Sequence, residues 1–176
     1  DHTDTINNYV NLGQYYYVAR QPARALASIQ HARNLCMVSY GVQHPEIPSV
    51  DIQMARALMD FKKFGIAMTY LDEALEVQRK INGSGTLLEG HIRIIAATAQ
   101  RDLGKHRAAV MSIKLAHDIY VDKFGEDDAR SKESLASYKL YAAEAVRFEK
   151  QRKLGVSAKK KTASGSRKAG LGRGNA

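Results

Sequence analysis

Residues of the same type recur along this chain at a spacing of 42 positions. The spacing joins three alanines, then three large aliphatic residues, then three further alanines, and finally three glycines. In that order they are Ala25, Ala67, Ala109, Ile29, Leu71, Ile113, Ala32, Ala74, Ala116, Gly41, Gly83 and Gly125. Four columns kept through three copies indicate an internal repeat, which is typical of a fold made by stacking similar units.

Within each copy, the order small, large, small predicts a packed helix. Offsets of 0, 4 and 7 residues lie on one face of an α-helix. The alanines let a neighbouring helix approach closely, and the large residue fills the space between them. The glycine comes after the helix, where a left-handed C-cap carries no steric penalty for this residue.

A second helix is predicted before each of these packed helices. In the first copy it runs from about Thr5 to Ala19, with Asp4 as its N-cap. Its expected core stripe, at offsets 0, 3, 4 and 7, consists of Tyr9, Leu12, Gly13 and Tyr16. Pro22 then begins the next helix, where its missing N–H costs no hydrogen bond.

The pattern predicts an all-α fold, a right-handed superhelix of helix pairs with about seven helices in all. The three repeats cover about 4–45, 46–87 and 88–129. A final helix over 131–152 would cap the stack and show water a more polar face. Residues 153–176, rich in Gly, Ser, Ala, Lys and Arg, are predicted to be a disordered tail.

Charge is concentrated in that tail. Residues 153–176 hold seven Lys or Arg and no acid, whereas residues 1–152 hold 20 basic and 18 acidic residues. The candidate nucleic-acid contacts are Lys159, Lys160, Lys161, Arg167, Lys168 and Arg173. Without aromatic residues, such a tail would bind RNA weakly and without sequence preference. A merely solvated tail, a membrane-surface contact and a nuclear import signal are the alternatives.

Catalytic and metal-binding patterns are missing from the sequence. No two histidines stand three or four residues apart, and neither a nucleophile elbow nor a phosphate loop occurs. Cys36, the one cysteine, is expected to be a small buried hydrophobe. No apolar run approaches the ~18 residues of a membrane span. We therefore expect no enzyme, no metal, no cofactor and no membrane insertion.

The inner face of the stack is the candidate peptide-binding groove. The first helices of the pairs should line it, and their residues outside the core stripes are largely polar. The candidate groove residues are Asn7, Asn11, Gln14, Tyr17, Gln53, Arg56, Thr98 and Arg101. Amide side chains in a groove can pair with the backbone of an extended peptide. The alternative is a solvated face, because hydrophobic residues interrupt the polar series in the third copy.

The first repeat resembles the tetratricopeptide consensus at Tyr9, Leu12-Gly13, Tyr16, Ala25 and Ala32. The loop that follows it, Gly41 to Glu46, contains the Gly-x-x-His-Pro sequence found in kinesin light chains and in clustered-mitochondria proteins. Residues 3–9, 31–35 and 124–134 are similar to the second of these families, and the resemblance covers residues 1 to about 150.

That resemblance implies an interaction scaffold in a large cytoplasmic protein that distributes mitochondria, binds messenger RNA and is linked to translation initiation. The expected partners are a protein or peptide on the inner face, with RNA contacted by the tail or by the rest of the protein. A peptide-binding cargo adaptor like the kinesin light chain and a direct RNA binder are the two rival functions.

Overall fold

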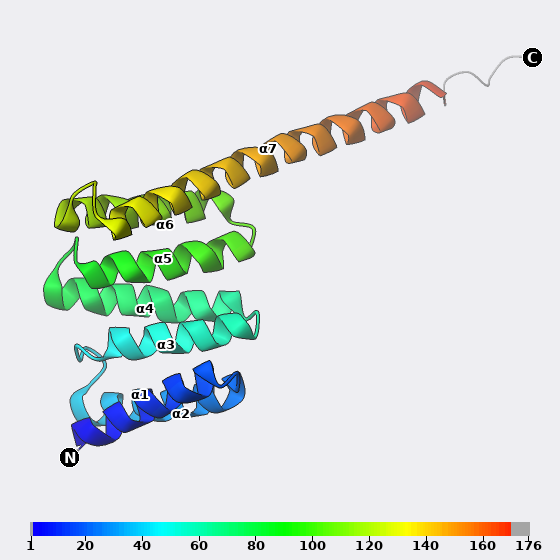
Figure 1. Cartoon of the computed structure of the whole chain (residues 1–176). Coiled ribbons are helices and arrows are strands. Elements are labelled where there is room, and N and C mark those ends of the chain that lie inside the picture. The colour runs from blue at the N-terminus through cyan, green and yellow to red at the C-terminus, as the bar shows by residue number, and fades with distance from the viewer. Residues whose placement is uncertain (1, 170–176) are drawn as a thin grey trace, which may run out of the picture.

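In a computed structural model of the chain, residues 2–169 are described, with side chains from residue 3 to residue 154. This part of the chain consists of seven α-helices joined by short turns and loops (Figure 1). They are α1 (His2–Val18), α2 (Pro22–Tyr40), α3 (Ile47–Asp60), α4 (Phe64–Asn82), α5 (Leu87–Asp102), α6 (His106–Phe124) and α7 (Ala129–Ala169). The predicted fold class and helix number are confirmed.

The helices form three antiparallel pairs, α1–α2, α3–α4 and α5–α6, which stack on one another, and α7 packs on α6 (Figure 1). Each helix contacts mainly its neighbours in the sequence, and the first helices also meet across the repeats, α1 with α3 and α3 with α5. The first helices therefore form one continuous layer, which is the face where a groove was expected.

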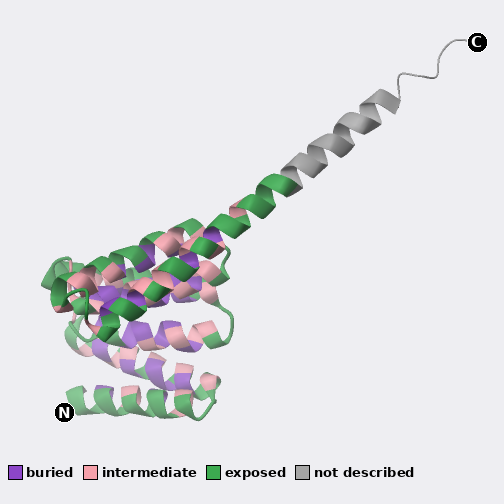
Figure 2. Cartoon of the chain, turned by 45° about the horizontal axis from the view of Figure 1, so that its top comes forward, coloured by how far each residue is buried: buried purple, intermediate pink, exposed green. Residues whose placement is uncertain are grey.

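The repeated columns form the core of the stack. Their alanine and large aliphatic side chains are at most 1% exposed, and Figure 2 shows buried residues on the sides where helices face one another. Gly41, Gly83 and Gly125 directly follow α2, α4 and α6 with φ angles of 88°, 74° and 82°. The small residues therefore pack as their spacing predicted. The glycines end the helices at positive φ, as expected, but their ψ angles of 169°, −169° and 167° lie in the extended region that only glycine adopts readily rather than in the predicted left-handed helical one. Cys36 is fully buried, as expected.

The buried stripe of α1 is rotated relative to the predicted one. Leu12 is 39% exposed, whereas Ile6, which was not in the predicted stripe, is only 3% exposed. Gly13 does lie at the contact with α2, because a Cβ atom there would be 2.5 Å from Cγ1 of Ile29. The contact is centred on the line through Ile6 and Gly13, so Leu12 lies at its margin. The prediction for Leu12 was wrong for this reason.

The last helix differs from the predicted 131–152 at both ends. It begins at Ala129, where the side chain and backbone N–H of Arg130 both hydrogen-bond to Asp128. It continues to Ala169, past the predicted end at Arg152. Lys, Arg and Ala, which are frequent after residue 152, are good helix formers. The predicted disorder of residues 170–176 lies outside the described residues.

Candidate functional site

The layer of first helices is hollowed where α1, α3 and α5 meet. This inner-face hollow has a volume of about 240 Å³. It is lined by Tyr17 of α1, by Arg56, Met59 and Asp60 of α3, and by Ile94, Ile95 and Thr98 of α5. Three of the candidate groove residues, Tyr17, Arg56 and Thr98, therefore come together from three different repeats.

The polar groups of the inner-face hollow are held by neighbours. Arg56 Nη2 lies 2.7 Å from His91 Nε2. Burial and the charge of Arg56 both lower the pKa of His91, so its neutral ring can accept this hydrogen bond. Thr98 Oγ1 donates to the backbone oxygen of Ile94 over 3.2 Å. The hollow thus combines an apolar floor with the guanidinium group of Arg56 and the carboxylate of Asp60.

The other candidate groove residues do not line this hollow. Asn7, Asn11 and Gln14 are exposed on α1, and Gln53 is half-buried on α3. Arg101 instead packs on the ring of Tyr141 in α7, 5.0 Å from its centroid, and pairs with Asp102. The predicted polar series is therefore divided, with only its middle part at the hollow.

Four lining residues of the hollow were not among the candidates. Met59 and Ile95 occupy positions equivalent to candidates but are apolar, so a search for polar groups passed over them. Asp60 stands four residues after Arg56, and Ile94 four residues before Thr98. Both positions lie one helical turn from a candidate, on the same face of its helix, and this spacing could have indicated Asp60 and Ile94.

The candidate RNA contacts fall outside this description. Lys159, Lys160, Lys161, Arg167 and Lys168 lie within α7, where side chains are not described, and Arg173 lies beyond the described residues. Their role stays a prediction.

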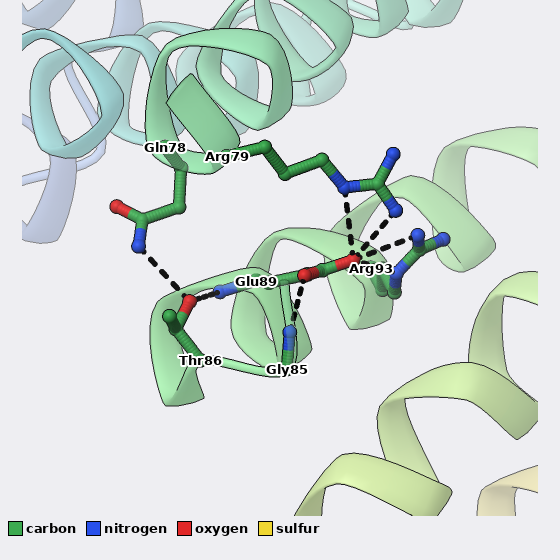
Figure 3. Close-up of polar contacts among 6 residues, drawn as sticks. All are labelled: Gln78, Arg79, Gly85, Thr86, Glu89 and Arg93. Atoms are coloured by element: carbon green, nitrogen blue, oxygen red, sulfur yellow. Dashed lines mark hydrogen bonds and ion pairs between the residues drawn. The ribbon is translucent and has the colours of Figure 1, made fainter. Parts of the chain in front are cut away.

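A buried carboxylate joins the second and third repeats (Figure 3). Glu89 Oε1 accepts hydrogen bonds from Arg79 Nη2 of α4 at 2.8 Å and from Arg93 Nε at 2.9 Å, and Oε2 accepts one from Gly85 N at 2.9 Å. Burial opposes the charge of Glu89, but these donors still lower the pKa of the carboxyl group. Thr86 caps α5 by accepting a hydrogen bond from Glu89 N.

A second cluster, centred on the buried carboxylate of Asp51, joins the first two repeats. Arg33 of α2 donates to Asp51 Oδ1 of α3 and to Glu73 Oε2 of α4, each over 2.5 Å, and its guanidinium lies 5.1 Å from the ring centroid of Tyr70. Burial raises the pKa of Asp51 to about 6, although Arg33 acts in the opposite direction. Both clusters fix one helix pair against the next and so hold the first helices that form the inner-face hollow.

Among residues 3–154, no group of three or more His, Cys, Asp or Glu side chains is placed to hold a metal ion. Within the described part of the chain, no helix is long and apolar enough to cross a membrane.

The stacked pairs, alanine columns and glycine stops define a helical-repeat fold of the tetratricopeptide kind. The family model described as "Tetratricopeptide repeat" matches residues 52–92. Two solved structures share the fold. BtubC (BKLC) from P. vanneervenii superposes with a TM-score of 0.77 at 16% identity, over 100% of this chain and 68% of that one. The N-terminal domain of stress-induced protein-1 from C. elegans gives 0.59 at 18% identity, over 80% of this chain and 97% of that one.

Among curated proteins, the chain is similar to clustered mitochondria protein homologs. The human protein is 27% identical over 150 residues, covering 85% of this chain and 12% of its own length. The Candida albicans protein is 29% identical over 133 residues, covering 76% of this chain and 10% of its own length. The resemblance found in the sequence is thereby confirmed, and the chain spans only about a tenth of the length of these relatives.

Proposed function

We propose that this chain is an interaction scaffold that docks an extended peptide segment of a partner protein on the layer formed by α1, α3 and α5. The observation that carries the proposal is the inner-face hollow, where side chains from three repeats converge on about 240 Å³ of space. Proteins of this class commonly present such surfaces to partners because stacking leaves one broad face open. An interaction role is also preferred to catalysis because the hollow is lined by apolar side chains with one cation, Arg56, and one carboxylate, Asp60, rather than by a hydrogen-bonded nucleophile and base.

The lining residues suggest which segment would fit. Met59, Ile94 and Ile95 provide an apolar floor for one aliphatic or aromatic side chain. Arg56 stands beside them and would pair with an acidic group of the same segment. Asn11 and Gln14, exposed on α1, could hydrogen-bond to the peptide backbone further along.

In its wider context, we propose that the scaffold serves a cytoplasmic protein that distributes mitochondria. The support is the similarity to clustered mitochondria protein homologs. Binding of messenger RNA, with a link to translation initiation, is the finer part of this proposal. It is supported by the seven cations and no acids of residues 153–176. A cargo adaptor resembling the kinesin light chain remains the alternative, since it would use the same inner face.

Peptide docking can be tested by selecting binders from a peptide array on the immobilised full chain and measuring their affinity by fluorescence anisotropy. We expect Arg56→Glu and Thr98→Arg to weaken the selected peptides by about tenfold or more, because one reverses the cation and the other fills the hollow. Lys114→Glu, an exposed charge reversal on α6, is the matched control. Equal binding by all three variants would refute docking at this hollow.

The RNA part needs a separate measurement. The full chain is compared by gel shift with a variant in which the six candidate cations between Lys159 and Arg173 are all replaced by Gln, at low and at high salt. We expect a salt-sensitive shift that the variant loses. RNA binding that survives these replacements would place the contact elsewhere.

A further inference from the structure

A second hollow lies at the other end of the stack, between the start of α6 and the middle of α7. It has a volume of about 340 Å³ and is separate from the inner-face hollow. One wall is the turn and first residues of α6, 104–108, and the other is formed by Ala145, Phe148, Glu149 and Arg152 of α7. We call it the α6–α7 hollow.

Within residues 2–169, α7 packs against a helix on one side only, and the α6–α7 hollow lies open there. In each of the three pairs the first helix is covered by a second helix, whereas within residues 2–169 no helix follows α7 to cover it. Its α6-facing residues, such as Tyr141 and Ala145, are buried, but Phe148 is 43% exposed. The ring of Phe148 is therefore only half-covered where it lines the hollow.

The floor of the hollow consists mainly of apolar side chains, together with the imidazole of His106, whose buried Nδ1 has no hydrogen-bond partner within the described part of the chain. The ring of Phe148 lies against that of His106, with centroids 4.4 Å apart. Ala108 and Ala145 complete the floor, and because their side chains are small they leave space above it. A space of about 340 Å³ is at the lower end of the range for ligand pockets and suits one bulky apolar side chain.

The rim is positively charged. Lys105, Arg107 and Arg152 surround the floor, and the one acid, Glu149, is paired with Arg107. The adjoining stretch of α7, residues 147–153, holds four basic residues and this single acid. An apolar floor with a cationic rim is complementary to an acidic segment that carries one large apolar side chain.

We propose that the α6–α7 hollow is a second docking site, for an acidic peptide segment of a partner protein anchored by one aromatic or large aliphatic side chain. The anchor packs on Phe148, Ala108 and Ala145, and its flanking carboxylates pair with Lys105 and Arg152. A nucleic acid fits less well, because the floor has room for one side chain rather than for a series of stacked bases.

The test uses the full chain and a defined probe, a fluorescein-labelled peptide of alternating Asp and Gly with one central Trp. Two control peptides replace the Trp by Ala or every Asp by Asn. We expect only the first peptide to bind, and its affinity to fall with added salt. A labelled oligouridylate serves as the nucleic-acid arm. Failure of the Trp-containing acidic peptide to bind, or equal binding of all three, would overturn the proposal.

Variants locate the site. Lys105→Glu and Arg152→Glu are each expected to weaken the peptide by about fivefold, as for an exposed ion pair, and Phe148→Ala by about tenfold. The matched control is Lys139→Glu, an exposed reversal on α7 away from the hollow. Melting midpoints establish that each variant is folded.

Each remaining outcome decides the question. If Lys139→Glu weakens the peptide as much as Lys105→Glu does, binding follows net charge and the site is wrong. If oligouridylate binds through Lys105 and Phe148 and displaces the peptide at lower concentration, the hollow is a nucleic-acid site and the proposal fails. Because Arg56 lies outside the α6–α7 hollow, its variant separates this site from the inner-face hollow.

Discussion

Small side chains set the distances between helices in this molecule. Ala67 is fully buried between α3 and α4, and a Cβ atom on Gly90 of α5 would lie 2.8 Å from Cε1 of Tyr120 in α6. Interiors are packed as densely as organic crystals, so extra atoms at such positions must displace the neighbouring side chain or its helix. The energetic importance of a residue here therefore depends on how close the atoms of the next helix come, rather than on its own size.

The alanine column can be tested at its central member. Ala67→Leu is expected to lower the free energy of unfolding by about 1–3 kcal/mol, because three added carbons overpack the contact between α3 and α4. Urea unfolding followed by circular dichroism measures the change. Ala27→Leu, at an exposed position of α2, should alter it by less than about 0.5 kcal/mol. Equal effects of the two substitutions would contradict the role of the column.

Asp51 gives the molecule a pH dependence of defined sign. Burial raises its pKa to about 6 in the folded chain, above the ordinary value of 3.8. The folded state therefore binds the proton more tightly, and the contribution of Asp51 to stability is greatest below about pH 4 and is lost as pH rises through about 6. Relative to Asp51→Asn, the wild-type chain should gain free energy of unfolding as pH falls from about 7 to about 4, by at most about 1.4 kcal/mol per pH unit. If the difference in free energy of unfolding between the two proteins stays constant across this range, burial does not raise the pKa of Asp51.

At the scale of elements, the repeated second helices were predictable and the contacts between repeats were not. The columns at Ala25, Ala67 and Ala109 fixed α2, α4 and α6, because close packing leaves a periodic pattern in the sequence. The donors around Glu89 come from α4, a loop and α5, and only folding brings them together. Its capping pattern, Thr86-x-x-Glu89, was a local signal that α5 begins there. The inner-face hollow was predictable in part. Its polar lining residues were among the candidates, whereas the apolar residues of its floor could not be distinguished from core residues in the sequence.

The contribution of the buried Glu89 carboxylate, which joins the second and third repeats, can be tested with an isosteric change. Glu89→Gln keeps the shape but removes the charge that Arg79 and Arg93 neutralise, so it should cost about 1–3 kcal/mol of unfolding free energy at pH 7. Because folding lowers the pKa of Glu89, this stabilisation is present above the ordinary value of 4.5 and is lost as pH falls through the lowered pKa. Glu76→Gln, which removes the charge of the exposed pair with Lys80, is the control and should leave the free energy of unfolding unchanged within the error of the measurement. A penalty for Glu89→Gln that persists in strong acid would mean that charge is not its cause.

At the scale of the whole molecule, stability should spread along the stack rather than through one common core. Each pair contacts only the pairs beside it, so damage to one interface should loosen mainly the helices that it holds.

Arg33→Met leaves buried Asp51 without its cation and weakens the interface between the first two repeats. We expect backbone amides of α1 and α2 to exchange hydrogen about 10- to 100-fold faster, with α5 and α6 nearly unchanged. Lys80→Met, at an exposed ion pair, should change neither end. If amide exchange in α6 becomes faster by the same factor, all helix pairs open together. A change at one hollow would then also alter the stability of the other.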